Sequence, residues 1–359
     1  MKHITFFLAL ILISTWLTAQ ERHINRIPDI PGYKTLVCDF HIHTVFSDGS
    51  VWPTVRVNEA WYEGIDAIAI TDYLKYRPHT KDITADHNRS YEIARDYAKN
   101  KDVIVIAGTE ITKEMPPGHF NAIFIKDANT IYNDDFNEAI KEATSQGAFI
   151  TWNHPGWRVQ QPDTMLWWDE HTFLFEKGWM HGIEVANGHE YYPEAISWAR
   201  DKNLTFLANS DVHSPIQVAY DLEKSRRTCT LVFATERSEG GIRDALFNGR
   251  TIAYFDNMLM GKENLLRAFL LQSLYIDHHE ESGFYTLTNP TEFNIEVQLT
   301  NKLYRDWSKT INVKPGKEHV FSLPAETSFE EISVTVKNFF TGADQCLSVP
   351  LSTIQPVDQ

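Results

Sequence analysis

The sequence is poor in cysteine and in basic residues, and both shortages narrow the class of protein. Its 359 residues include three cysteines, Cys38, Cys229 and Cys346. The number is odd and no two are close in sequence, so a disulfide framework is not expected. Lys and Arg number 33 against 48 Asp and Glu, a net charge of −15. Such a charge argues against a protein that binds nucleic acids or anionic membranes generally, but not against a phosphate substrate, because bound divalent ions can reverse the local field.

The chain also lacks a hydrophobic run long enough for a confident transmembrane helix. Its apolar stretch at residues 4–17 follows Lys2 and precedes small and polar residues up to Gln20, which matches a secretory signal peptide. A buried N-terminal helix is the alternative. We therefore expect an exported protein, periplasmic or extracellular, with no membrane span after cleavage. Loss of residues 1–20, which contain one basic and no acidic residue, would leave a net charge of −16.

Hydrophobic residues make up 43% of the chain and include ten Trp, so a sizeable core is expected. Between residues 36 and 213, apolar runs typical of buried strands alternate with amphipathic helical segments. The expected strands are residues 36–43, 65–73, 103–112, 120–125, 148–154, 182–187 and 205–211, and the expected helices are residues 53–62, 85–99, 134–146 and 193–201. This alternation predicts an α/β fold whose mostly parallel sheet closes into a barrel.

Polar residues collect at the ends of these predicted strands. They are His41 and His43, residues 71–73, residues 108–110, Asn153 and His154, Glu184 and Asn187, and residues 209–213, with His119 just before the fourth strand. In such barrels the active site lies at the carboxyl ends of the strands. The sequence therefore predicts one shared site there, and its His, Asp and Glu content favours a metal centre over a purely structural cluster.

The run DFHIHTVFSDG at residues 39–49 begins this site. On a strand, His41 and His43 point to the same side, and two imidazoles at that spacing can bind one metal ion. Asp39 and Asp48 are expected to add carboxylate oxygens. Because His-x-His also occurs in ordinary strands, the motif gains its weight from the polar strand ends that follow it.

Six segments together resemble the successive motifs of the PHP (polymerase and histidinol phosphatase) superfamily. They are HIHTVFSDG, AITD, GTEIT, GHFNAIFI, NHPG and NSDVH, within residues 36–255. The resemblance implies a distorted (β/α)7 barrel and a metal-dependent phosphoesterase with two or three divalent ions, commonly zinc, manganese or iron.

The resemblance also implies which residues bind these ions. The first ion would be held by His41, His43, Glu110 and Asp211, the second by Glu110, His119 and His154, and the third by Asp48 and His213. Glu110 would bridge the first two ions.

The chain departs from the family pattern at Tyr73, where the second motif usually ends in a histidine that binds the third ion. A neutral phenol is a poor metal ligand. We expect either a two-metal enzyme or a weak third site completed by Tyr73, water or a nearby group such as His79.

Such a cluster predicts phosphoester hydrolysis by metal-bound hydroxide, with Asp211 or His213 assisting proton transfer. Arg77 and His79 would bind the phosphate, unless they belong to a solvated loop, and Tyr73 joins them as a substrate-binding candidate. Export favours phosphodiesters of small organic molecules as substrates. The oligomeric state stays open.

Several residues near these motifs have supporting roles. Asp72 and Asn153 are expected to orient metal ligands. The residues around and after NHPG are expected either to wall a pocket for an apolar leaving group or to pack in the core and a lid. They are Trp152, Trp157, Arg158, Trp167 and Trp168.

A helix at residues 241–249 and a strand at residues 252–256 are expected to end the barrel. Beyond residue 265, the runs FNIEVQLTN, HVFSLP and EISVTVKNFF alternate apolar and polar residues, which is typical of a small β-sandwich. We therefore divide the chain into a signal peptide (1–20), a barrel (21–262) and an all-β sandwich (263–359). Exported bacterial phosphodiesterases that act on organophosphate diesters have a similar arrangement.

Two other functions remain open from the sequence. An amidohydrolase also begins with His-x-His on its first strand, although the GTE motif, the Asp-x-His ending and the lack of a mid-barrel lysine favour a phosphoesterase. A non-catalytic metal-binding scaffold, with Tyr73 marking a decayed site, is the second.

Overall fold

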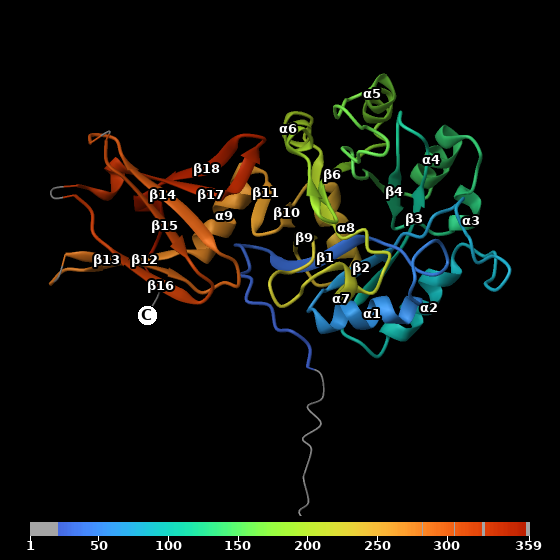
Figure 1. The fold of residues 1–359 in the computed structure, drawn as a ribbon, viewed down its shortest axis with the longest axis horizontal. Helices are drawn as coiled ribbons and strands as arrows, with labels where there is room; N and C mark the ends of the chain where they lie inside the picture. The colour runs from blue at the N-terminus through green and yellow to red at the C-terminus, as the bar shows by residue number, and fades with distance from the viewer. Residues whose placement is uncertain (1–20, 282, 305, 325–326, 357–359) are drawn as a thin grey trace, which may run out of the picture.

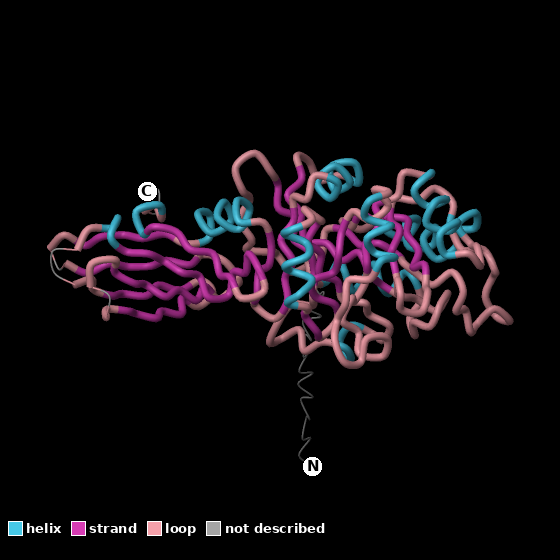
Figure 2. Tube along the Cα trace, turned by 90° about the horizontal axis from the view of Figure 1, so that it is seen from above, coloured by secondary structure: helices cyan, strands magenta, loops and turns pink. Residues whose placement is uncertain are grey.

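The computed structural model describes residues 21–281, 283–304, 306–324 and 327–356. The predicted signal peptide lies outside these ranges. A barrel covered by helices adjoins a set of long C-terminal strands (Figures 1 and 2). No helix in the described ranges is long and apolar enough to cross a membrane.

All the strands expected between residues 36 and 213 are present and form the barrel wall. They are β1 (Lys34–Ile42), β2 (Ala67–Ile70), β3 (Ile104–Ile111), β4 (Phe120–Ile123), β5 (Phe149–Trp152), β6 (Gly182–Asn187) and β8 (Thr205–Asn209), and β7 (Glu190–Tyr191) pairs with β6 in a hairpin. Neighbouring strands run parallel except at β4, which is antiparallel to β3 and β5. A parallel bridge between Ile42 and Val212 joins β1 to the segment after β8. This is the distorted α/β barrel that the sequence predicted.

Helices cover the outside of the barrel, apart from the last one, which packs mainly against the C-terminal strands (Figure 1). They are α1 (Pro53–Tyr62), α2 (Arg89–Ala98), α3 (Ala128–Ile131), α4 (Phe136–Ser145), α5 (Asp169–Glu176), α6 (Pro193–Asp201), α7 (Ile216–Ala219), α8 (Glu239–Phe247) and α9 (Glu263–Ser273). Pro at the first position starts α1 and α6, where its missing N–H costs nothing. In α4, the Asp135 side chain accepts the N–H groups of Asn137 and Glu138, and the helix buries one apolar face.

The C-terminal strands continue the barrel sheet rather than forming an isolated unit. β9 (Cys229–Ala234) pairs with β1, and β10 (Thr251–Phe255) and β11 (Met258–Gly261) follow. β11 then pairs in parallel with β17 (Ile332–Gly342), which carries β14 (Ile295–Asn301) and β18 (Gln345–Pro350), and β15 (Ser308–Val313) pairs with β14. A second, antiparallel sheet holds β12 (Tyr275–His279), β13 (Phe284–Asn289) and β16 (Lys317–Phe321), and the short 3-10 helices η1 (Phe329–Glu331) and η2 (Leu351–Thr353) flank β17 and β18.

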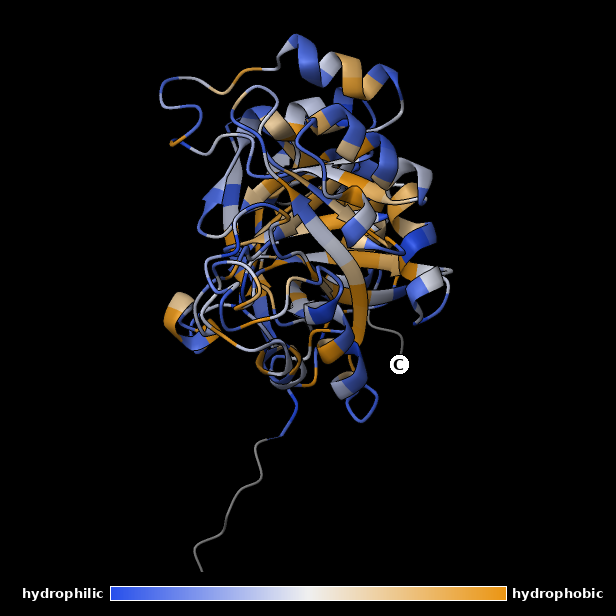
Figure 3. Ribbon diagram, turned by 90° about the vertical axis from the view of Figure 1, so that its right-hand side faces the viewer, coloured by the Kyte–Doolittle hydropathy of each residue, from blue (hydrophilic) through white to orange (hydrophobic). Residues whose placement is uncertain are grey.

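The core follows the alternation seen in the sequence. In β14, Ile295, Val297 and Leu299 are buried and the residues between them are partly exposed. Figure 3 shows hydrophobic residues along the strands in the interior of the molecule, and on parts of the helices around them. One apolar cluster runs from Val37 in the barrel to Val334 in β17. The predicted domain boundary after residue 262 therefore falls within a continuous core, and it stays a prediction.

Candidate metal centre

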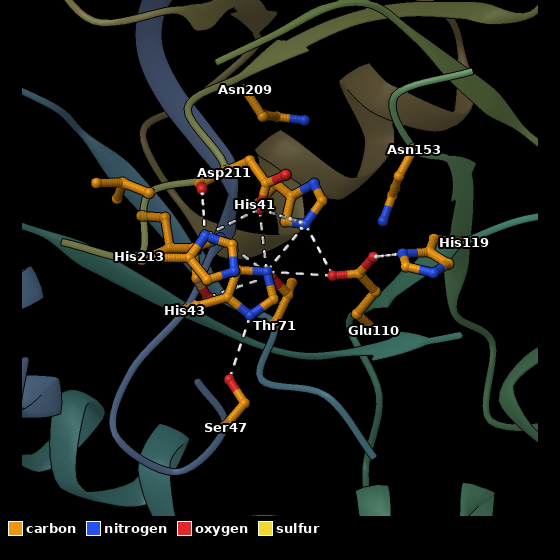
Figure 4. A network of polar contacts seen from close by, with 12 residues as sticks. His41, His43, Ser47, Thr71, Glu110, His119, Asn153, Asn209, Asp211 and His213 are labelled. Carbon is orange, nitrogen blue, oxygen red and sulfur yellow. Dashed lines mark hydrogen bonds and ion pairs between the residues drawn. The ribbon is translucent and has the colours of Figure 1, made fainter. Parts of the chain in front are cut away.

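Strand β1 places two histidines on one face of the barrel wall. His41 and His43 alternate with Phe40 and Ile42, and both histidines are fully buried. Their Nε2 atoms lie 3.1 Å apart (Figure 4). This is the arrangement that the His-x-His spacing predicted.

Two carboxylates from other strands meet this pair. Glu110, near the end of β3, has its Oε2 2.9 Å from Nε2 of His41 and 3.1 Å from Nε2 of His43. Asp211 follows β8, and its Oδ1 lies 3.1 Å from each of the same nitrogens. Four donor atoms from three segments of the chain thus converge.

The second oxygen of Glu110 faces two further histidines. Its Oε1 lies 3.0 Å from Nδ1 of His119 and 3.6 Å from Nε2 of His154. His119 precedes β4 and His154 follows β5. Because β4 runs opposite to its neighbours, both histidines reach the same end of the barrel. One carboxylate therefore connects two groups of potential ligands.

A third group lies beside His43. The Nε2 of His213 is 3.2 Å from Oδ1 of Asp48, and its ring stacks on that of His43 with centroids 4.2 Å apart. Tyr73 also contacts His43, with ring centroids 4.5 Å apart. Burial and the nearby Glu110 carboxylate raise the pKa of the Tyr73 phenol above its ordinary value. Without a cation this phenol stays neutral and is a poor metal ligand.

The donor atoms fit divalent cations. Three groups of side chains each have ligand atoms within 4.8 Å of one another. The first group is His41, Glu110 and His154, the second is His41, His43 and Asp211, and the third is His43, Asp48 and His213. Four of the buried atoms in these ion-pair contacts make no hydrogen bond, and they are Glu110 Oε1, Asp211 Oδ1, Asp48 Oδ1 and His119 Nδ1. Buried polar atoms without a hydrogen bond are costly, and bound cations would coordinate such oxygens and nitrogens. His119 contacts Glu110 but belongs to none of the three groups.

The same packing sets the charges of the cluster. Burial lowers the pKa of His43, but the carboxylates of Asp211 and Glu110 outweigh it and raise that pKa to about 9. Burial raises the pKa of Asp211, and the neighbouring His41 and His43 more than reverse this. Protons and metal ions therefore compete for these imidazoles.

Glu184, on β6, orients two of the candidate ligands. Its Oε1 accepts hydrogen bonds from Nδ1 of His41 at 3.0 Å and from Nδ2 of Asn209 at 2.9 Å. Its Oε2 accepts from Nδ2 of Asn187 at 2.8 Å and from the backbone N–H of His154 at 2.7 Å. With Nδ1 of His41 as donor, Nε2 keeps its lone pair for a metal.

A second carboxylate supports His43. Nδ1 of His43 donates to Oγ of Ser47 at 3.2 Å, and Ser47 donates to Oδ1 of Asp72 at 2.7 Å. Thr44 donates through Oγ1 to the other oxygen of Asp72 at 2.7 Å. Asp72 thus lies in the orienting position expected from the sequence. The other residue expected to orient metal ligands is Asn153. Its Oδ1 accepts a hydrogen bond from the backbone N–H of Asn121 at 3.2 Å.

Asp39 does not join the metal cluster, so the expectation that it supplies a ligand oxygen is wrong. Its carboxylate accepts hydrogen bonds from the backbone N–H and the Oγ of Ser210, at 3.0 and 2.6 Å, and pairs with Nη1 of Arg227 at 3.1 Å. This holds the residue before Asp211. Asp211 has a φ of 51°, which is unfavourable for a residue with a side chain, and its N–H donates to the carbonyl of His41 at 2.9 Å.

The predicted phosphate-binding residues lie apart from the cluster. The guanidinium of Arg77 donates to backbone carbonyls of Phe46 at 3.0 Å and Thr84 at 2.8 Å, and also to that of Ala85. Its donors therefore anchor a loop. His79 is exposed and does not line the cavity at the metal cluster. Of the three substrate-binding candidates, Tyr73 is the one that lines this cavity.

That cavity has a volume of about 410 Å³. Its lining comprises Asp48, Tyr73, His154, Trp157, residues 187–190, Tyr192, Asp211 and His213. Trp157 is therefore a pocket wall, and Arg158 lines an adjoining cavity. Trp152 is fully buried and stacks on His171 with centroids 3.7 Å apart, which is core packing.

Sequence reasoning missed Gln160 and Arg227. The Nε2 of Gln160 lies 3.1 Å from Nε2 of His119, in a loop where no periodicity marks it. The sequence placed Glu184 at the end of a predicted strand but gave it no role. An acidic residue within the otherwise apolar, buried strand GIEVAN was the signal that could have indicated one.

Comparison with known proteins identifies the family. No family model matches the sequence. The crystal structure of a two-domain protein from Bacteroides vulgatus, which contains a predicted PHP-like metal-dependent phosphoesterase, superposes with a TM-score of 0.88 at 46% identity, over 92% of this chain and 98% of that one. The chain belongs to this family of PHP-like metal-dependent phosphoesterases. It is therefore an enzyme of this class, with clusters compatible with metal binding.

Other proteins are less similar to this PHP-like phosphoesterase chain. An uncharacterised protein of Methanocaldococcus jannaschii is 28% identical over 188 residues, which is 49% of this chain and 81% of that protein. A candidate metal-dependent phosphoesterase from Bifidobacterium adolescentis shares 17% identity with a TM-score of 0.39, over 49% of this chain and 87% of that one. The family assignment rests on the Bacteroides vulgatus structure.

Proposed function

We propose that this exported enzyme hydrolyses phosphodiesters of small organic molecules at a centre of two divalent ions, with zinc, manganese or iron as the candidates. The observation that carries the proposal is the position of Glu110, whose two oxygens face separate groups of buried imidazoles. A carboxylate so placed suits a bridging ligand.

The proposed roles follow from the contacts. When bound, such ions lower the pKa of a coordinated water and offset charge on the phosphoryl oxygens. His41, His43 and Asp211 would hold one ion, and His119 and His154 the other, with Glu110 between them. Nδ1 of His213 donates to the backbone carbonyl of Asp211 at 2.7 Å, so its ring is fixed at the cavity edge. In this proposal Asp211 or His213 would take the proton of the attacking water.

The lining of the cavity supports a diester over a monoester. Among the described residues around it there is no Lys or Arg, and Glu190, which is outside the candidate ligand groups, is acidic. A monoester dianion carries one more negative charge than a diester, and this lining offers no Lys or Arg to pair with that charge. The net charge of −15 and the acidic residue Glu190 in the cavity lining also argue against a nucleic-acid substrate.

Metal content and turnover test the proposal together. Protein purified without chelators is assayed for bound metal and for hydrolysis of p-nitrophenyl phosphate and bis-p-nitrophenyl phosphate. We expect two ions per chain and faster hydrolysis of the diester. His41→Ala and Asp211→Ala should abolish both activities, and Glu170→Gln, at an exposed position of α5, should retain them. Bound metal with turnover of lactones or amides instead would support an amidohydrolase, and bound metal with no turnover would support a scaffold.

A further inference from the structure

Two cavities meet beside the metal cluster. The one at the cluster shares His189, Glu190 and Tyr192 with a larger cavity of about 750 Å³. The rest of the lining of the larger cavity includes Arg158, Met165, Tyr191, Glu194 and Phe255. An ester substituent that extends from a phosphoryl group at the metal cluster past these shared residues would reach the second cavity. The scissile oxygen would then lie near the wall that the two cavities share.

His189 stands on that wall and is held in place. Its Nε2–H donates to the backbone carbonyl of Ala219 at 2.9 Å, and its ring contacts Tyr220 with centroids 4.7 Å apart. The preceding Gly188 has a φ of +56°, which favours glycine, and its carbonyl accepts hydrogen bonds from Tyr220 at 3.1 Å and Thr228 at 2.6 Å. The turn is thus fixed on both sides of the imidazole, and Nδ1 remains for a ligand.

Other proton donors around the cavity at the cluster are engaged or unsuited. His154 and His213 belong to the ligand groups. Burial raises the pKa of Tyr73 and Tyr192 above the ordinary value of a phenol, and Tyr192 donates to Oε2 of Glu190 at 3.4 Å. Within the described lining of this cavity, His189 is the imidazole outside the candidate ligand groups.

We propose that His189 is the general acid that protonates the leaving oxygen, and that the leaving alcohol occupies the second cavity. This inference rests on the proposed function. As water adds to phosphorus, the bond from phosphorus to the leaving oxygen breaks and its electron pair stays on that oxygen. The Nδ1–H proton of protonated His189 passes to this oxygen, and the neutral alcohol departs. The imidazole then regains a proton from solvent.

The need for a general acid depends on the leaving group, which gives a selective test. Methyl p-nitrophenyl phosphate releases a stable phenolate, whereas benzyl methyl phosphate of similar shape releases a basic alkoxide. In His189→Gln, we expect kcat for benzyl alcohol release to fall by about 100-fold or more, and kcat for p-nitrophenol release to change by less than about threefold. In His189→Ala, added imidazole should restore part of the activity on the benzyl ester.

The outcomes separate this inference from the proposed function. The matched control is His278→Gln, an exposed histidine on β12 that should leave both rates unchanged. Retained p-nitrophenol release shows that His189→Gln is folded and metal-loaded. An equal loss on both esters, or no loss on either, overturns the role of His189 while the function stands. No wild-type turnover of either diester would contradict the proposed function and this inference with it.

Discussion

Nδ1 of His41 donates a hydrogen bond to Oε1 of Glu184 at 3.0 Å, and both side chains are fully buried. The contact joins β1 to β6 across the barrel. It fixes which nitrogen of His41 carries the proton, so that Nε2 faces Glu110 and Asp211 with a free lone pair. The geometry of the candidate metal centre thus depends on a carboxylate that lies outside the candidate ligand groups.

Glu184→Gln should weaken metal binding. The amide of the new Gln side chain would still accept a hydrogen bond from His41. It lacks the negative charge that increases the basicity of the His41 imidazole. We expect the metal dissociation constant to rise by about 10- to 100-fold. Competition with a chromophoric chelator measures it. Glu170→Gln, at an exposed position of α5, is the control, and an unchanged dissociation constant in Glu184→Gln would refute the orienting role.

Tyr73→His should strengthen the third group of ligands. The ring of Tyr73 already contacts His43, so an imidazole there would join His43, Asp48 and His213. We expect one more equivalent of bound zinc per chain, measured by equilibrium dialysis followed by elemental analysis. Tyr73→Phe, which adds no ligand, should bind the wild-type number of ions. If wild type already binds three ions with equal affinity, the third site does not depend on a histidine.

The stability of the metal-free protein should fall between pH 6.5 and 4 partly through His171. Its ring stacks on Trp152, its Nδ1 accepts the N–H of Trp168 at 3.0 Å, and burial lowers its pKa from 6.5 to about 4. As pH falls through this window, the unfolded chain takes up the proton before the folded chain does. This difference destabilises the fold by up to about 3 kcal/mol.

Urea denaturation of the metal-free protein at pH 7 and pH 5 measures this contribution. His171→Phe should lose less stability between the two pH values than wild type. His278→Gln, at an exposed position, should follow wild type. An identical pH dependence in His171→Phe would show that His171 is not responsible.

Arg227→Met should be strongly destabilising. The guanidinium is fully buried and pairs with Asp39 at 3.1 Å and, through Nε, with Glu63 at 3.0 Å. Removing it leaves buried carboxylates unpaired, which costs about 3–5 kcal/mol. Chemical denaturation measures the loss, and Asp39→Asn combined with Arg227→Met should recover part of it. A loss below about 1 kcal/mol would contradict this account.

Local patterns predicted the elements and the convergence of the site. The bounds of α1 and α6 agree with the predicted helices because Pro53 and Pro193 mark their starts and apolar periodicity marks their length. The polar residues at the strand ends lie close together because the carboxyl ends of parallel barrel strands meet at one end of the barrel. The roles of the site residues in metal binding and catalysis stay predictions.

Long-range pairings had no such signal. Asp39 and Arg227 are 188 residues apart, and an acid next to a histidine motif reads as a ligand until its partner is known. Arg77 was expected to bind phosphate, but carbonyls of its own loop and of Phe46 take up its donors. The reversal of β4 depends on sheet pairing, which strand periodicity does not encode.

In the described residues, the pairing of β11 with β17 puts the barrel and the C-terminal strands in one sheet rather than on either side of a flexible linker. Main-chain bonds join the two, and α9 begins at Glu263, two residues after β11 ends. Phe255, opposite Met258 in the β10–β11 hairpin, also lines the second cavity. This part of the second cavity's lining is therefore anchored by the C-terminal strands, and closure of two lobes about a linker would not control access of a substrate to it.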